Sequence, residues 1–165
     1  MKTMIPILAV FFLFYFYTNK EEILIPDYAI RFRVIANSNS KEDQELKKKV
    51  KEEVEEKLNH LMVNAKNSEE AKQLLKNELT SIQDLVQTYS KDSEISLGKN
   101  FFPEKEYHGV VYPSGDYESL VITLGHGLGN NWWCVMYPPL CLLEEKGENT
   151  EYRFLVKDLI EKYTS

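Results

Sequence analysis

The residues best suited to chemistry are concentrated in one segment, residues 125–141. Cys134 is a candidate nucleophile, with His126 or His108 as the general base that would deprotonate its thiol. Three glycines nearby would let the backbone turn tightly and direct N–H groups toward an oxyanion. They are Gly125, Gly127 and Gly129. A cysteine-dependent hydrolase is therefore one hypothesis, although no third residue stands out that would orient the histidine.

The same segment is also compatible with a structural role for its cysteines. Cys134 and Cys141 enclose six residues, and a turn at Pro138–Pro139 can bring their Cα atoms within bonding distance. The alternative is that both cysteines are buried, unbonded thiols. A disulfide would remove the nucleophile, so the disulfide and the hydrolase exclude each other.

No motif for a metal ion, a nucleotide or a common hydrolase is present in the sequence. The cysteines and histidines lack zinc-ligand spacing, and Gly-x-Ser-x-Gly, His-Glu-x-x-His and Walker-type patterns are absent. The glycine triplet lacks the final spacing and the following helix of a dinucleotide fingerprint. We therefore expect no metal and no cofactor, and we assign no catalytic residue.

Two pairs of side chains are candidates for binding. Arg31 and Arg33 share one face of a predicted strand, either as exposed strand positions or as anchors for the neighbouring Asn-Ser loop or a partner carboxylate. Trp132 and Trp133 are adjacent, so in a strand they point to opposite faces. We expect one tryptophan to lie in the core and the other to contact a partner.

The composition describes one ordinary globular domain rather than a nucleic-acid-binding protein. The chain has 165 residues and a net charge of −6, and phosphate binding requires a local excess of Lys and Arg. The most basic stretch, residues 47–51, is flanked by glutamates and is typical of a solvated helix face.

The N-terminus carries an apolar run, residues 5–17, that follows Lys2. It is shorter than the about 20 residues of a membrane-spanning helix and fits the core of an export signal. No small-x-small cleavage site follows it. We therefore expect residues 1–19 to be a signal peptide or a short membrane anchor, and residues 20–165 to form one exported domain.

The elements that must position these residues can be predicted from periodicity. Alternation predicts a strand over residues 28–36, and the turn-forming residues 37–40 end it. Helical periodicity follows over residues 41–63, and again from Ser68, the expected N-cap, to Tyr89. Further strands are expected at residues 95–101, 107–112, 119–124 and 132–137, with a turn at 114–116 and a final helix at 151–163. The predicted fold is α+β: a largely antiparallel sheet of about five strands, covered by two long helices and a C-terminal helix.

Two long motifs together resemble the stage II sporulation protein R family. The first is residues 30–40 (IRFRVIANSNS), continued by residues 43–47 (DQELK). The second is residues 125–141 (GHGLGNNWWCVMYPPLC), and the Tyr-Glu-Ser-Leu step at residues 117–120 also fits. The resemblance extends from about residue 26 to residue 143. Leu128 occupies a position where polar residues are typical of the family, and it either alters partner specificity or packs inward.

The resemblance implies an exported sporulation signal. Such proteins are made in the forespore and exported into the space between forespore and mother cell. There they activate a membrane-embedded aspartic protease of the mother cell, which processes the pro-form of sigma-E. Residues 5–17 would be the only membrane contact, and the alternative remains a secreted cysteine-dependent hydrolase of the envelope. The expected partner-binding residues are Arg31, Arg33, Asn37, Ser38, Asn39, Gly125, Gly127, Gly129, Asn131, Trp132 and Trp133.

Overall fold

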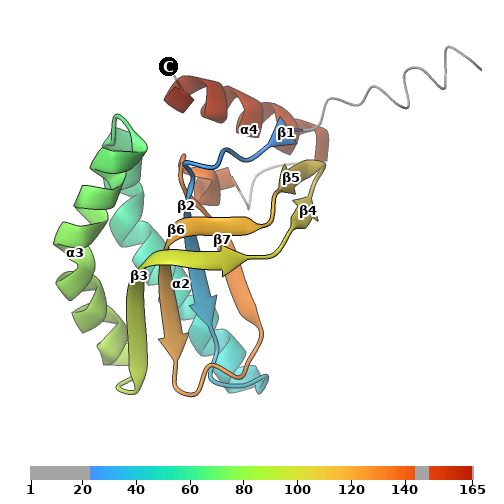
Figure 1. Cartoon of the computed structure of the whole chain (residues 1–165). Helices are drawn as coiled ribbons and strands as arrows, with labels where there is room; N and C mark the ends of the chain where they lie inside the picture. Colours follow the sequence, from blue (N-terminus) through green and yellow to red (C-terminus); the bar gives the residue numbers. More distant parts are fainter. Residues whose placement is uncertain (1–22, 144–148, 165) are drawn as a thin grey trace, which may run out of the picture.

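The computed structural model describes residues 23–143 and 149–164, and Figure 1 shows their arrangement. The expected signal or anchor at residues 1–19 lies outside these ranges. No helix within them is long and apolar enough to cross a membrane. In chain order the elements are β1 (Ile23–Leu24), β2 (Ile30–Ile35), α2 (Lys41–Asn64), α3 (Ser68–Tyr89), β3 (Ser93–Phe102), β4 (Lys105–Tyr107), β5 (Val110–Tyr112), β6 (Gly115–Leu124), β7 (Asn131–Tyr137), the 3-10 helix η1 (Leu140–Leu143) and α4 (Asn149–Thr164).

The α+β class is confirmed, but the strands form two sheets rather than one. The larger sheet has the order β3-β6-β2-β7, and the smaller has the order β1-β5-β4. Most neighbours are antiparallel, whereas β2 runs parallel to β6 and β1 runs parallel to β5. The connection from β2 to β6 passes through both long helices, which is long enough for a parallel pairing.

Two turns differ from the sequence-based expectation. The strand expected at residues 107–112 is a hairpin, because His108 and Gly109 take positive φ values of 50° and 75° and reverse the chain between β4 and β5. The turn expected at residues 114–116 is largely strand. Gly115 and Asp116 pair with β3, which shows that the long β3–β6 ladder overrides their turn propensity.

Side-chain caps fix where the two long helices begin. The Ser40 hydroxyl accepts a hydrogen bond from the Asp43 N–H at 3.1 Å, as its position before α2 predicts. The cap of α3 is Asn67 rather than the expected Ser68, and its Oδ1 accepts from the Glu70 N–H at 2.9 Å. Ser68 is already the first residue of the helix.

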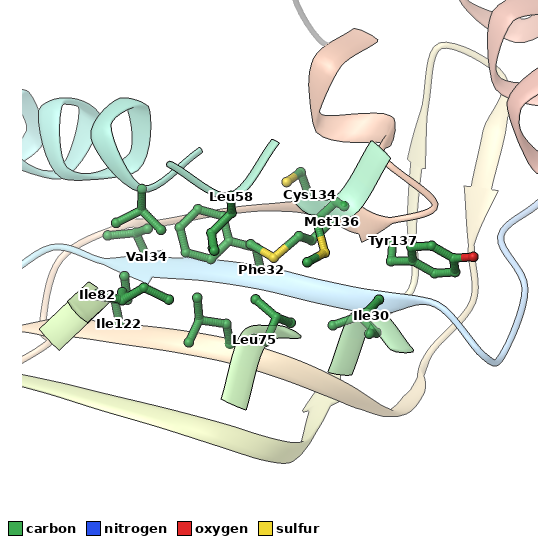
Figure 2. Packing of buried hydrophobic residues seen from close by; sticks show 14 of the residues in the cluster. Ile30, Phe32, Val34, Leu58, Leu75, Ile82, Ile122, Cys134, Met136 and Tyr137 are labelled. Atoms are coloured by element: carbon green, nitrogen blue, oxygen red, sulfur yellow. The ribbon is translucent and has the colours of Figure 1, made fainter. Parts of the chain in front are cut away.

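The main core lies between α2, α3 and one face of the larger sheet. Phe32 on β2 is fully buried there, and Figure 2 shows it packed among residues of the neighbouring strand β7 and the helices. The helices contribute Val50, Val54, Leu58, Met62, Ala71, Leu75, Ile82 and Val86. Both long helices therefore cover this one face, as expected.

The C-terminal helix covers a different part of the molecule. Residues Tyr152 and Val156 of α4 pack with Val110 and Tyr112 of the small sheet and with Val135 of β7. The hydroxyls of Tyr112 and Tyr152 are hydrogen-bonded at 2.8 Å inside this second cluster. The expectation that all helices share one sheet is therefore wrong for α4, which lies over the small sheet (Figure 1).

Candidate functional site

The two sequence motifs meet at one edge of the larger sheet. Since β2 and β6 are parallel neighbours, the loops that follow them leave the sheet side by side. The Asn37 Oδ1 accepts from the His126 N–H at 2.9 Å, and the Asn39 Oδ1 accepts from the Asn130 N–H at 2.7 Å. We call these loops the loop pair: residues 37–40 and residues 125–130.

The glycines of the loop pair permit a close approach between its two segments. Gly125 and Gly127 take positive φ values of 55° and 64°, a conformation in which glycine is unstrained. A Cβ at Gly125 would overlap the Asn37 side chain, and a Cβ at Gly129 would overlap the backbone carbonyl of Ser38. These three glycines therefore have a structural reason to be present, whether or not a partner touches them.

The first turns of α2 hold the loop pair in place. The Asp43 carboxylate accepts hydrogen bonds from the Ser38 hydroxyl and the Asn37 amide, and these bonds lower the pKa of Asp43. The Lys47 ammonium donates to the carbonyl of Asn130 at 3.0 Å, and burial lowers its pKa. In the sequence, only the Ser40–Asp43 capping pattern indicates that α2 holds these loops.

Part of the loop pair remains accessible. Leu128 is 79% exposed, so it does not pack inward, and His126 and Asn131 are exposed beside it. A pocket of about 420 Å³ opens next to them. Its lining is Asn37, Asp43, Leu46, Ser90, Asp92, Leu124, Gly125 and His126.

The expected surface position of Arg31 is wrong, because its side chain is fully buried. The end of the β3–β6 hairpin bends across the sheet (Figure 1) and places the Phe102 and Tyr117 rings over the guanidinium. The Arg31 Cζ lies 3.7 Å from the Tyr117 ring centroid and 5.1 Å from that of Trp133. Its Nη2 donates to the Pro113 carbonyl at 3.0 Å. Desolvation lowers the pKa of Arg31.

Arg33 lies on the same face and is half-buried. Its Cζ is 4.0 Å from the Phe102 ring centroid, and its Nη2 donates to the Phe101 carbonyl at 2.9 Å. Desolvation lowers the pKa of Arg33. Neither arginine contacts the loop pair through a hydrogen bond in the described part of the chain, so the anchoring role considered for the Asn-Ser loop is not observed.

The two tryptophans lie on opposite faces of β7, as adjacent strand residues must. Trp132 packs edge-on against Phe32 on the helix-covered face, with ring centroids 5.7 Å apart. Trp133 packs against Phe102 and Tyr112 on the other face, at 5.6 and 5.8 Å. Both are half-buried and each packs against one of the two core clusters, so neither is set apart as the single core tryptophan that the sequence predicts.

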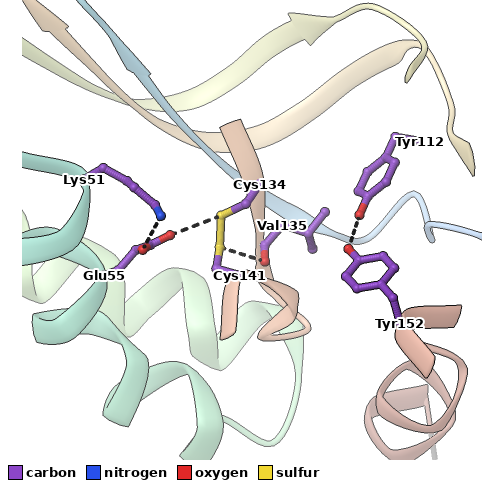
Figure 3. The surroundings of a disulfide bond; sticks show 7 residues. All are labelled: Lys51, Glu55, Tyr112, Cys134, Val135, Cys141 and Tyr152. Carbon is purple, nitrogen blue, oxygen red and sulfur yellow. Dashed lines mark hydrogen bonds and ion pairs between the residues drawn. A yellow bond between two sulfur atoms is a disulfide. The ribbon is translucent and has the colours of Figure 1, made fainter. Parts of the chain in front are cut away.

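Cys134 and Cys141 form a disulfide, shown in Figure 3, with their Cα atoms 5.5 Å apart. It joins β7 to η1 across a corner that contains the cis Tyr137–Pro138 peptide. In this form Cys134 has no thiol, so the hydrolase hypothesis lacks its nucleophile. Glu55 lies within 4.8 Å of both sulfur atoms, but bonded sulfurs are not thiolate ligands for a metal.

Sequence reasoning missed the aromatic side chains that cover the arginines. Phe102 and Tyr117 are distant in the sequence from Arg31 and reach it only through the bend of the hairpin. The alternation of β3 and β6 carried a signal for strands but none for this bend. In the sequence, Tyr117 stands out only as part of a turn-to-strand step.

The fold and the site define a disulfide-bonded α+β protein whose two long motifs interlock in a single structure. Residues 26–147 match the model of the stage II sporulation protein R family, and the chain belongs to this family. This confirms the resemblance of the motifs and supports a role in sporulation.

A relative named stage II sporulation protein R, from Bacillus subtilis (strain 168), is 38% identical over 133 residues. The match covers 77% of this chain and 59% of the relative, so the chain spans less than two thirds of that protein's length. No solved structure matches this chain.

Proposed function

We propose that this chain is an exported sporulation signalling protein. In this proposal it binds and activates a membrane-embedded aspartic protease of the mother cell, which then processes the pro-form of sigma-E. The chain itself contributes a binding surface and no catalytic group. Membership of the stage II sporulation protein R family supports this assignment.

The loop pair is the single observation that carries the proposal. Its two segments belong to the two family-like motifs. They are joined by hydrogen bonds that the Asn37 and Asn39 side chains accept from the other segment, and Asp43 of α2 holds Asn37 in place. A surface held in one conformation before binding loses less conformational entropy on association. Leu128 projects from this rigid surface and is well placed to enter an apolar pocket of a partner.

Export from the forespore is part of the same proposal. A disulfide persists in oxidising compartments outside the cytoplasm and is rare inside it. The Cys134–Cys141 bond and the apolar run at residues 5–17 both support an extracytoplasmic location, in the space between forespore and mother cell.

The experiment that tests the function is reconstitution in a non-sporulating host. The full chain, the protease and pro-sigma-E are produced together, and cleavage of pro-sigma-E is followed by immunoblotting. We expect cleavage only when the chain is present and exported, and none when residues 2–19 are deleted. An exported chain that leaves pro-sigma-E intact would contradict the proposal.

A further inference from the structure

Arg31 and Arg33 are unusual because they have no acidic partner among the described residues. The chain has more acidic than basic residues, yet no ion pair involves either arginine within the described residues. The recorded ion pairs lie on or between α2 and α3, or join α3 to Glu118. The Arg31 guanidinium instead lies near three aromatic rings, and the Arg33 guanidinium lies over one of them, Phe102. We call this group the arginine box: Arg31, Arg33, Phe102, Tyr117 and Trp133.

The hydrogen-bonding capacity of the two guanidiniums is largely unused. Arg31 donates through Nη2, while its Nε and Nη1 are buried without a partner. Arg33 likewise donates through Nη2, and its Nε is buried without a partner. The Nη1 of Arg33 also has no hydrogen bond to any described residue, but unlike the three nitrogens above it is not fully buried. Stacking on aromatic rings stabilises a buried cation, but it does not satisfy these N–H groups.

The surroundings add further positive charge. The Lys105 ammonium lies 4.9 Å from the Trp133 ring centroid, at the rim of the arginine box. Glu104, Glu106 and Asp116 are nearby in the sequence, but their side chains are exposed, and none forms an ion pair with the box in the described part of the chain. The box is therefore a local positive site on a protein whose net charge is −6.

We infer that the arginine box receives a carboxylate from an acidic segment of the protein partner. This inference rests on the proposed function and adds a second contact site to the loop pair. Arg33 is the half-buried group that the carboxylate meets, and the fully buried Arg31, two residues along the same strand face, contributes charge. Of the donors without a partner, the Arg33 Nη1 is the accessible one, and a carboxylate is the acceptor that pairs best with a guanidinium. Trp133, which is half-buried, supplies apolar surface beside the two arginines.

The chemistry favours a peptide over an anionic membrane. Membrane-surface binding draws on clusters of about four to eight Lys and Arg. Among the described residues of the box and its rim, the accessible cations are Arg33 and Lys105, beside the apolar surface of Trp133. One carboxylate flanked by apolar side chains matches that arrangement.

The test compares binding of the full, disulfide-bonded chain to the detergent-solubilised protease, for Arg33→Gln and for Lys99→Gln. Lys99 is an exposed cation of β3 outside the box and serves as the matched control. We expect Arg33→Gln to weaken binding at least about tenfold, because a desolvated charge pair loses one partner. Lys99→Gln should stay within about twofold of the wild type. Equal affinities of wild type and Arg33→Gln would overturn the inference, while binding by the wild type would leave the proposed function intact.

A second measurement covers the case in which Arg33→Gln does not fold. Acetylated hexaglutamate is titrated into the wild-type chain, and the tryptophan fluorescence, to which Trp133 of the box contributes, is followed. We expect a saturable change that high salt weakens, and its absence would overturn the inference. If the wild type binds this peptide but not the protease, the proposed function is wrong, whereas the ability of the arginine box to bind carboxylates is supported. Arg33-dependent binding to anionic vesicles, with unchanged binding to the protease, would assign the box to a membrane and also overturn the inference.

Discussion

Asn37 connects three segments of the molecule through one side chain and one carbonyl. Its Oδ1 accepts from the His126 N–H, its amide donates to Asp43, and its backbone carbonyl accepts from the Leu128 N–H. An aspartate or a serine at this position would lack either the donor or the reach. The residue is therefore a structural element of the loop pair.

Gly129 provides the sharpest test of the loop-pair contact at the level of one residue. A Cβ there would overlap the Ser38 carbonyl, whereas a Cβ at Gly98 would meet nothing within 4 Å. We expect Gly129→Ala to lower the free energy of unfolding by about 1–3 kcal/mol, the usual cost of overpacking. Gly98→Ala is the matched control, and urea unfolding measures both. Equal stabilities of the two variants would contradict the described contact.

Asp43 predicts a specific pH dependence. Hydrogen bonds from Ser38 and Asn37 hold its pKa below the ordinary value. A carboxyl with a lower pKa in the folded than in the unfolded chain stabilises the fold above the unfolded pKa of about 3.9, and this stability is lost as the pH falls through the folded pKa.

The measurement is thermal unfolding of Asp43→Asn and the wild type at pH 7 and pH 3. We expect the variant to unfold at a lower temperature at pH 7, and the difference to shrink at pH 3. Asp84→Asn removes an exposed carboxylate of α3 and should show neither effect. A difference that stays constant with pH would rule out a stabilising role for the ionised Asp43.

At the scale of elements, local signals determine the helices and long-range pairing determines the site. The periodicity and caps of the sequence predict α2 and α3 closely. The approach of the loop pair depends on the parallel register of β2 and β6, in which Arg31 lies opposite Ser119. That register joins residues far apart in the chain, so no local pattern reveals it. The bend that buries Arg31 is equally non-local.

The Cys134–Cys141 bond is the element-scale link between β7 and η1. The cysteines are seven positions apart, and closing so short a loop stabilises the fold by about 2 kcal/mol. We expect Cys134→Ser and Cys141→Ser to lower the free energy of unfolding by similar amounts. Chemical reduction should destabilise the wild type but not the double variant. If reduction leaves the free energy of unfolding of the wild type unchanged, the disulfide does not stabilise the fold.

At the scale of the whole molecule, the two candidate contact sites face different surroundings. The loop pair lies at the end of the larger sheet opposite α4 and β1 (Figure 1). The arginine box lies on the face that the bent hairpin and the small sheet cover. β1 is the first element of the described chain, and the loop pair lies at the opposite end of the molecule from it (Figure 1). An N-terminal tether would therefore leave the loop pair free to meet a partner.

The central claim is that the loop pair forms the surface that activates the protease, and Leu128→Asp tests it most directly. This change places a charge at a position of the loop pair that is 79% exposed, without touching its internal hydrogen bonds. Leu24→Asp makes the same change at an exposed leucine of β1.

Cleavage of pro-sigma-E is measured in the reconstituted host at matched export levels. The account predicts at least about a tenfold loss of cleavage for Leu128→Asp, as expected for a contact worth about 1.4 kcal/mol or more, and near wild-type cleavage for Leu24→Asp. Full activity of Leu128→Asp would contradict it.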